Sequence, residues 1–362
     1  MPPSPKPASE RRTGNRTALI AFWGVVGGVS LVGAGILQYL GPPPQTPLPM
    51  AAIQHGPPIP SPPKPPVKPK VLPEVTAMGT GSTLPMGAPI PPANQALLGP
   101  AVTHPNWPVP RIAPNGLAPM RAYAASVPAI AGPHVALLVA DLGDDDAQSQ
   151  EAITMLPAAV SFGLTPYGAH IGALAALACA SGHELILEIP MQPLNPATEN
   201  AGNEALVMAG PISLDQPMLD WDLSQFQGYA GVTDAIGASQ GAGFMNNPNA
   251  KAWLLREIAD KGLFFIDARQ TGDSLYAWNR TADVVIDPVS APQNEAAQLA
   301  SLIQLAKLRG SALGILMIPA PNAVHMLQSW IQTLGANGVS LVPVSALVLP
   351  PSAPAATAMV SP

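Results

Sequence analysis

Residues 134–146, HVALLVADLGDDD, carry the pattern that decides the fold. The aliphatic and small residues of Val135–Ala140 predict a strand buried on both faces, and a charged residue, Asp141, follows at its end. Similar short apolar runs recur along the rest of the chain. They predict further strands at residues 160–164, 184–189, 228–232, 263–267, 284–287, 312–318 and 340–343.

Helix-length segments separate these predicted strands. The clearest lie at residues 170–181, 248–261, 294–309 and 322–334, and the glycines that follow them, of the kind that ends helices, are Gly182, Gly262, Gly310 and Gly335. Strands and helices alternate in this way over about 210 residues, which predicts an α/β fold with parallel strands. Either an open sheet or a (β/α) barrel of seven or eight strands fits the pattern, and in both the ligand binds where strands end and loops begin.

Carboxylate side chains follow several predicted strands at their C-terminal ends. Asp141 ends the first strand, Glu188 lies near the end of the third, and Asp267 ends the fifth. Because parallel strands end at one edge, we predict these three as catalytic candidates, suited to acid/base work or to binding a hard cation. The acidic run 144–146 either joins them or caps the next helix, and capping is also the alternative for Asp141.

Histidines and serines give no metal centre and no nucleophile motif. His183 lies at the opposite end of its strand from Glu188, and five residues at about 3.3 Å each separate them by about 16 Å, so both cannot bind one ion. No HExxH pair is present in the sequence, and we interpret Ser239 in GASQG (237–241) as a loop serine rather than as the nucleophile of a GxSxG elbow. We predict no metal or cofactor, with a divalent cation as the open alternative. His183 and Asp234, which follows the fourth strand, stand as ligand-binding candidates.

Residues 17–40, TALIAFWGVVGGVSLVGAGILQYL, contain no charge. At about 1.5 Å per residue they exceed the roughly 30 Å hydrocarbon core of a bilayer, so we expect one transmembrane helix. The basic residues of segment 1–16 precede it, which predicts a cytoplasmic N-terminus, a single pass through the inner membrane and a periplasmic C-terminal domain. A cleavable signal peptide is the alternative, although its apolar region is shorter, about 7 to 15 residues.

Composition divides the rest of the chain. Residues 41–133 hold 26 of the 47 prolines, so we expect a Pro-rich disordered linker over 41–108, and a disordered tail over 349–362. The single cysteine, Cys179, excludes an internal disulfide and a cysteine metal site. Residues 134–362 carry seven Lys and Arg against twenty Asp and Glu, which makes nucleic acid a poor partner.

Taken in order, the motifs resemble the divergent polysaccharide deacetylase family, a relative of the NodB-type carbohydrate esterases. The segments that carry the resemblance include VALLVADLG (135–143), LPAAVSFGLTPYG (156–168), SGHELILEIPMQPL (181–194), KGLFFIDAR (261–269) and GVSLVPVSAL (338–347). The lead-in VPRIAPNGLAPMRAYA resembles the segment that precedes this domain in some members, so the domain is expected to span residues 109–348. The resemblance implies a NodB-like, distorted (β/α) barrel.

For catalytic relatives, the resemblance further implies a divalent metal held by one Asp and two His, a second Asp as base, and removal of acetyl groups from a polysaccharide. This sequence departs from that pattern. Ala140 and Asp141 stand where an Asp pair is expected, Glu188 stands in place of a rim His, and the later His motifs match residues 233–235 and 317–320, which contain no His. A rim of acidic residues suits calcium, magnesium or manganese better than zinc, if it binds metal; its members are Asp141, Glu188, Asp234 and Asp267.

The resemblance implies a role in carbohydrate metabolism, with an envelope polysaccharide or peptidoglycan as partner. Because the metal-binding histidines are missing, we expect a degenerate site that binds glycan rather than deacetylates it. A non-catalytic periplasmic scaffold for envelope proteins is the alternative. Aromatic residues in loops are candidate sugar platforms, or else pack into the core; they are Tyr167, Trp221, Phe226, Tyr229, Phe244, Tyr276 and Trp278.

Overall fold

The computed structural model describes residues 87–127, 131–208, 210–236, 241–269, 274, 276–286, 294–318 and 322–352. The predicted cytoplasmic segment 1–16, the predicted transmembrane helix 17–40, most of the predicted linker and residues 353–362 lie outside the described residues. Of the helices in the described ranges, none is long and apolar enough to cross a membrane.

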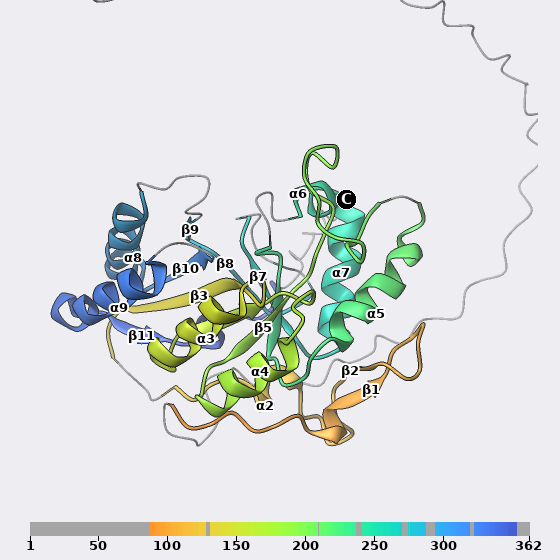
Figure 1. Cartoon of the computed structure of the whole chain (residues 1–362), viewed down its shortest axis with the longest axis horizontal. Coiled ribbons are helices and arrows are strands. Elements are labelled where there is room, and N and C mark those ends of the chain that lie inside the picture. The colour runs from red at the N-terminus through yellow and green to blue at the C-terminus, as the bar shows by residue number, and fades with distance from the viewer. Residues whose placement is uncertain are drawn as a thin grey trace, which may run out of the picture. The chain divides into compact units, whose positions relative to one another are not determined.

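Nine strands form one sheet, which curls into a half-barrel (Figure 1). The order is β8-β7-β6-β5-β4-β3-β10-β9, with β11 also paired to β3, and these ladders are all parallel. All eight predicted strands are present, with ends that differ by at most three residues. The bounds are β3 His134–Leu142, β4 Ser161–Leu164, β5 Leu185–Glu188, β6 Gly231–Thr233, β7 Phe264–Asp267, β8 Asn279–Thr281, β9 Val284–Ile286, β10 Ser311–Met317 and β11 Ser340–Val342.

Side chains of the strands alternate between two buried layers. In β3, Val135, Leu137 and Val139 pack against the outer helices, whereas Ala136 and Leu138 face the interior of the half-barrel. The helices are α2 Pro119–Ala122, α3 Asp146–Met155, α4 Ile171–Ala180, α5 Gln216–Ser224, α6 Ala242–Met245, α7 Pro248–Asp260, α8 Glu295–Arg309 and α9 Ala323–Leu334. Because both faces of the strands are buried, the strands appear in the sequence as continuous apolar runs.

Three of the four predicted glycine stops are confirmed. Gly182, Gly262 and Gly310 follow α4, α7 and α8 with φ of 82°, 72° and 86°, in the left-handed region that glycine adopts without strain. The fourth is confirmed in position only: α9 ends at Leu334, directly before Gly335 as predicted, but Gly335 has φ of -59° and begins a 3-10 turn, Gly335–Asn337. That turn ends at Gly338, with φ of 69°.

The predicted linker was drawn too long at its C-terminal end. Residues 87–108 belong to the folded domain: β1 (Leu98–Pro100) pairs antiparallel with β2 (Pro108–Pro110), and Leu97 is fully buried. Pro100, Pro108 and Pro110 stand at the ends of these two short strands, where a missing N–H costs little. Residues 87–108 and the lead-in that follows them close the N-terminal end of the half-barrel. There the amide of Met120 donates to the carbonyl of Gly262 at 3.0 Å.

The start of the predicted disordered tail is also part of the fold. Leu349 forms an antiparallel bridge with Asn279 of β8, with backbone hydrogen bonds of 3.0 and 2.9 Å. Sequence composition did not reveal this contact because β8, with the polar sequence NRT, gives no apolar run for a partner to follow.

Candidate functional site

Asp141, at the C-terminal end of β3, has an unusual backbone conformation. Its φ of 64° lies in the left-handed region, which is uncommon for a residue other than glycine. The ladder between β3 and β4 shifts register between Val139 and Leu142, so a bulge interrupts the regular alternation at this residue. A bulge of this kind redirects a side chain, and a conformation of this kind is often kept at functional sites.

Glu188 lies behind Asp141 at the end of β5 and is fully buried. Its Oε1 atom accepts a 2.6 Å hydrogen bond from the backbone N–H of Asp141, whereas its Oε2 atom is buried without a hydrogen-bond partner. Burial raises the pKa of Glu188 well above its ordinary value, and the charges of Asp141 and Asp144 raise it further, although the hydrogen bond opposes this. This shift favours the neutral form of Glu188, whose carboxyl group holds the backbone of Asp141 in place.

Gly163 of β4 leaves room for the Glu188 carboxyl group. A Cβ atom at this position falls 2.6 Å from Glu188 Oε1 and 3.3 Å from the Cα of Ala140, closer than side chains pack. We expect Gly163→Ala to lower the free energy of unfolding by about 1–3 kcal/mol through overpacking. Chemical denaturation measures it. In the double variant Gly163→Ala/Glu188→Ala the shorter of these contacts, with the Glu188 carboxyl group, is absent, so additive losses in that variant contradict this explanation.

Asp234 and Asp267 form a second carboxylate pair, on β6 and β7. The register pairs Thr233 with Ile266, which sets the two carboxylates on neighbouring strands one position later. Burial and the charge of Asp267 raise the pKa of Asp234 to about 8, against the lowering effect of the Ala268 amide and Arg269. Arg269 Nε lies 3.4 Å from Asp234 Oδ2, and Asp267 lies 4.0 Å from Lys251 Nζ. Arg269 and Lys251 therefore compensate part of the negative charge of this buried pair.

His183 has a structural position. It is 1% exposed, at the N-terminal end of β5, and its two ring nitrogens lie 2.9 and 3.0 Å from the carbonyl oxygens of Val160 and Ile153. Burial lowers the pKa of its ring, although the contacts with the two carbonyls oppose the shift. The structure therefore gives no support to His183 as a ligand-binding residue, because both nitrogens are occupied and no surface is exposed.

A cavity of about 520 Å³ opens beside Asp141, at the C-terminal edge of the sheet. Of the five predicted site residues, Asp141 lines it, whereas Glu188, Asp234, Asp267 and His183 are at most 1% exposed. Three carboxylates stand in its wall, Asp141, Asp144 and Glu199, and the described residues of its lining include no Lys or Arg. The remaining lining residues are Thr165, Tyr167, Met191, Pro193, Asn200, Ala201, Gly202, Ile236 and Gly241.

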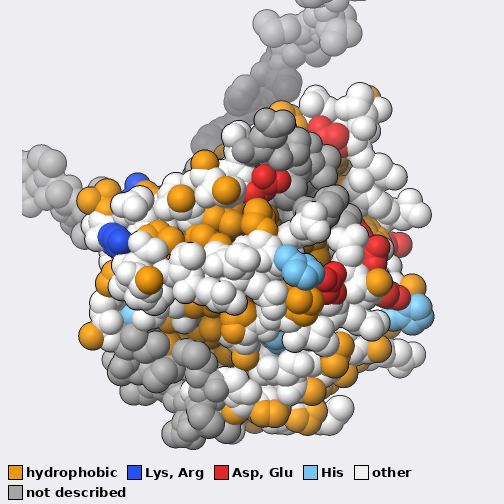
Figure 2. Space-filling model, turned by 60° about the vertical axis from the view of Figure 1, so that its left-hand side comes forward, with side chains coloured by type: hydrophobic (Ala, Val, Ile, Leu, Met, Phe, Trp, Pro, Cys, Tyr) orange, Lys and Arg blue, Asp and Glu red, His pale blue; other side chains and the backbone are white. Residues whose placement is uncertain are grey.

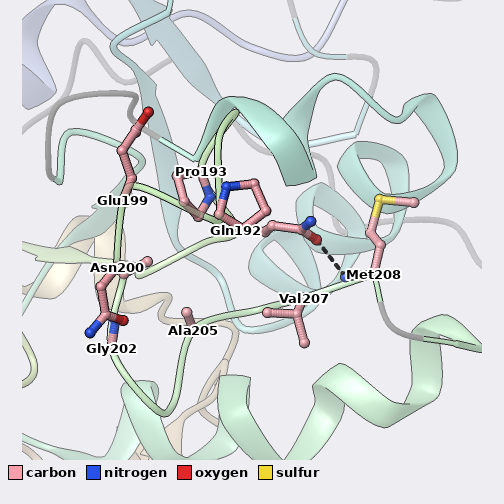
Figure 3. Close-up of a pocket in the computed structure, with 10 residues that line it drawn as sticks. Gln192, Pro193, Glu199, Asn200, Gly202, Ala205, Val207 and Met208 are labelled. Atoms are coloured by element: carbon pink, nitrogen blue, oxygen red, sulfur yellow. Dashed lines mark hydrogen bonds between the residues drawn. The ribbon is translucent and has the colours of Figure 1, made fainter. Parts of the chain in front are cut away.

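The loop after β5, residues 190–208, builds most of the outer wall. Its two arms are tied together, because the Gln192 amide donates to the Leu206 carbonyl at 2.7 Å and the Met208 amide donates to Gln192 Oε1 at 3.1 Å. Figure 3 shows this second bond within an adjoining cavity of about 280 Å³. Gly243 of α6 packs directly on the loop, since a Cβ atom there lies 2.2 Å from the Pro193 carbonyl oxygen.

Most of the aromatic candidates belong to the core. Tyr167 is 38% exposed and lines the Asp141 cavity, and Trp221, partly exposed, packs beside it with ring centroids 5.6 Å apart. Tyr276 is partly buried and stacks under the guanidinium of Arg256 at 4.2 Å. The others are at most 8% exposed and offer no sugar platform; they are Phe226, Tyr229, Phe244 and Trp278.

A model of one protein family, described as divergent polysaccharide deacetylase, matches residues 137–348. This chain belongs to the divergent polysaccharide deacetylase family. The order of the sequence motifs predicted this family, and the match confirms it. The parallel half-barrel is consistent with the NodB-like fold expected for its members.

Two relatives of this divergent polysaccharide deacetylase family member are themselves uncharacterized. A protein of Haemophilus influenzae is 24% identical over 210 residues, which cover 55% of this chain and 71% of that protein. The crystal structure of an uncharacterized protein from Agrobacterium tumefaciens is similar with a TM-score of 0.61 and 27% identity, over 66% of this chain and 99% of that one.

The metal that a divergent polysaccharide deacetylase is expected to hold does not fit the residues present. Glu188, beside Asp141, is fully buried and already accepts the Asp141 amide, its raised pKa disfavours the ionised form that a metal needs, and the described lining of the cavity contains no His. Among the described residues, no three His, Cys, Asp or Glu side chains are placed to hold an ion. The four-carboxylate cation site considered from the sequence is therefore wrong, because its members separate into two pairs.

Sequence reasoning missed the loop residues of the cavity, chiefly Glu199 and Asn200. The position of this loop in the sequence could have indicated them, since it directly follows a strand whose C-terminal end was predicted to lie at the rim. In the view of Figure 2, acidic side chains gather towards the right and the upper part of the surface, whereas Lys and Arg lie at the left edge.

Proposed function

We propose that this domain binds a glycan of the cell envelope in the Asp141 cavity and does not deacetylate it. The observation that carries the proposal is a cavity of about 520 Å³ with a carboxylate, Asp141, and an exposed aromatic ring, Tyr167, in one wall. Sugar recognition uses this combination, in which carboxylates accept hydroxyl hydrogen bonds and a ring packs on the apolar face of the sugar. Family membership supports a polysaccharide-related ligand.

The charge of the cavity selects among glycans. Asp141, Asp144 and Glu199 line it, without Lys or Arg in the lining. Acidic sugars are repelled, and neutral or amine-bearing sugars are accepted. The absence of a fitting metal set removes the group that polarises the acetyl carbonyl and activates water in metal-assisted hydrolysis, which supports binding without deacetylation.

Asp141→Asn tests the proposal, with Asp260→Asn as control, because Asp260 is exposed at the end of α7. We expect the wild-type full-length chain to bind the N-acetylglucosamine tetramer and the glucosamine tetramer in calorimetry, and polygalacturonate not at all. Hydrogen bonds to a charged group contribute about 1.5–3 kcal/mol, so Asp141→Asn should weaken binding about tenfold or more, and Asp260→Asn should not.

Two outcomes contradict the proposal. Equal affinity of the Asp141→Asn and Asp260→Asn variants places the ligand elsewhere. Release of acetate from the acetylated tetramer by the wild-type chain, lost in Asp141→Asn, makes the domain a deacetylase.

We further propose that residues 17–40 anchor the chain in the inner membrane, with the domain in the periplasm. The uncharged 24-residue run and the basic segment before it support this topology. An alkaline phosphatase fused after residue 352 is then active, and the domain stays with membranes after an alkaline wash. Recovery of the domain in the soluble periplasmic fraction shows instead that the segment is a cleaved signal peptide.

A further inference from the structure

A second cavity, of about 370 Å³, lies next to the Asp141 cavity and shares part of its wall. We name it the Trp221 cavity; its lining residues are Tyr167, Asn200, Gly202, Asn203, Glu204 and Trp221. Tyr167, Asn200 and Gly202 also line the Asp141 cavity. The ring of Tyr167 therefore lies between two spaces, each within or close to the size range of small-ligand sites.

The aromatic surface between the cavities is held in place. The Tyr167 hydroxyl donates to the Ala201 carbonyl at 3.0 Å and accepts from the Glu204 amide at 3.3 Å. Gly202, with φ of 94°, allows this contact, since a Cβ atom there lies 2.3 Å from the ring. Trp221 of α5 packs on the same ring with an interplanar angle of 36°. The result is a rigid, two-ring platform that needs little ordering when a ligand binds.

A buried carboxyl group stands behind this platform. Asp222 follows Trp221 on α5 and is fully buried, and neither of its carboxyl oxygens has a hydrogen-bond partner. Burial raises its pKa well above the ordinary value, and the charge of Glu204 adds to this. Two of its electrostatic neighbours, Tyr167 and Glu204, are walls of the Trp221 cavity, and another, Tyr229, is buried in the core. An unpartnered polar group beside a cavity is not explained by packing alone.

We propose that the Trp221 cavity is a second sugar subsite, so that the ligand is a chain of at least two sugar units that crosses Tyr167. One unit occupies the Asp141 cavity, and the next stacks on Trp221 and meets the amides of Asn200 and Asn203. The inference rests on the proposed glycan binding and adds to it a direction and a minimum length of the ligand. It also gives a role to Trp221, which the sequence predicted as a candidate sugar platform in a loop and which the structure places on α5.

Chain-length dependence tests the second subsite. The probes are N-acetylglucosamine, its β-1,4-linked dimer and its tetramer, titrated into the full-length chain by calorimetry. We expect the dimer and tetramer to bind at least about tenfold more tightly than the monomer, since stacking on a second platform adds to the first contact. Trp221→Ala should abolish the length dependence, so that the tetramer binds no more tightly than the monomer does to the same variant, and Trp221→Phe, which keeps a ring, should restore most of the difference.

Fluorescence supplies a readout that a loss of folding does not imitate. Binding of the tetramer should change the tryptophan emission of the wild-type chain and of Trp330→Phe, whose ring lies on α9, but not that of Trp221→Phe. A monomer that binds as tightly as the tetramer, or a Trp221→Ala variant that keeps the length dependence, overturns the second subsite and leaves the first intact. Failure of every probe to bind the wild-type chain overturns the proposed function and the subsite together.

Discussion

Replacement of Glu184 by Ala should lower the free energy of unfolding by about 3–6 kcal/mol, the largest effect that we expect for one side chain. Glu184 is fully buried just before β5 and gathers three parts of the chain. Its Oε1 accepts from Ser161 Oγ at 3.1 Å and from the Ser345 amide at 3.0 Å, and its Oε2 accepts from the Ala125 amide at 3.1 Å. Loss of these acceptors leaves two buried donors, on Ser161 and Ser345, and one partly buried donor, the Ala125 amide, unpaired, and each buried one costs about 1–3 kcal/mol.

Thermal and chemical denaturation measure this effect. For a domain of this size, each kcal/mol lowers the melting temperature by about 2–4 °C. Glu184→Gln, which keeps one acceptor oxygen, should be intermediate. Glu295→Ala, at the partly exposed start of α8, is a control that should change stability by about 0.5 kcal/mol or less. A Glu184→Ala variant as stable as this control shows that water replaces the lost acceptors.

Replacement of Glu188 by Gln should flatten the dependence of stability on pH. Because burial and the charge of Asp141 raise the pKa of Glu188, the folded state keeps a proton that the unfolded chain releases above about pH 4.3. The folded state therefore binds more protons than the unfolded state. The stability from this group is fully present below pH 4.3 and is lost as pH rises through the raised pKa.

Urea denaturation at pH 5, 6.5 and 8 measures the effect. The free energy of unfolding of the wild-type chain should fall across this series, and that of Glu188→Gln should fall less, because glutamine mimics the neutral acid without titrating. Asp234, whose pKa is raised to about 8, titrates in both proteins and leaves a residual slope. Parallel curves for wild type and Glu188→Gln show that Glu188 is ionised in the folded state.

The strands were predictable because a parallel sheet covered on both faces needs continuous apolar runs, which few other structures need. Strand β8 was not predictable from the sequence. Asn279, Arg280 and Thr281 form a strand because they pair with β7, and not because these residue types favour strands. Residues 87–108 were predicted as linker because of their prolines, although Ile90 and Leu97 are buried in the core. The composition of a segment does not reveal one or two buried residues of this kind among many prolines.

For the site, the sequence located the edge but not the arrangement within it. Asp141, Glu188, Asp234 and Asp267 all end or follow strands, as predicted, yet exposure separates them. Whether a rim carboxylate faces a cavity depends on a positive φ at Asp141, on the space that Gly163 leaves and on the cations near Asp234. These depend on the three-dimensional neighbours of each residue, which spacing along one strand does not contain.

The central position of β3 has a consequence for the order of folding. This strand pairs on one side with β4, its neighbour in sequence, but its other partners, β10 and β11, lie near the end of the domain. The same holds for the Glu184 contacts, because Ser345 is 161 residues away along the chain. Contacts this distant make folding slow, since a long loop must close before they form. A chain emerging from the ribosome therefore cannot complete its core until its last strand has been synthesised, and it stays open to chaperones and proteases until then.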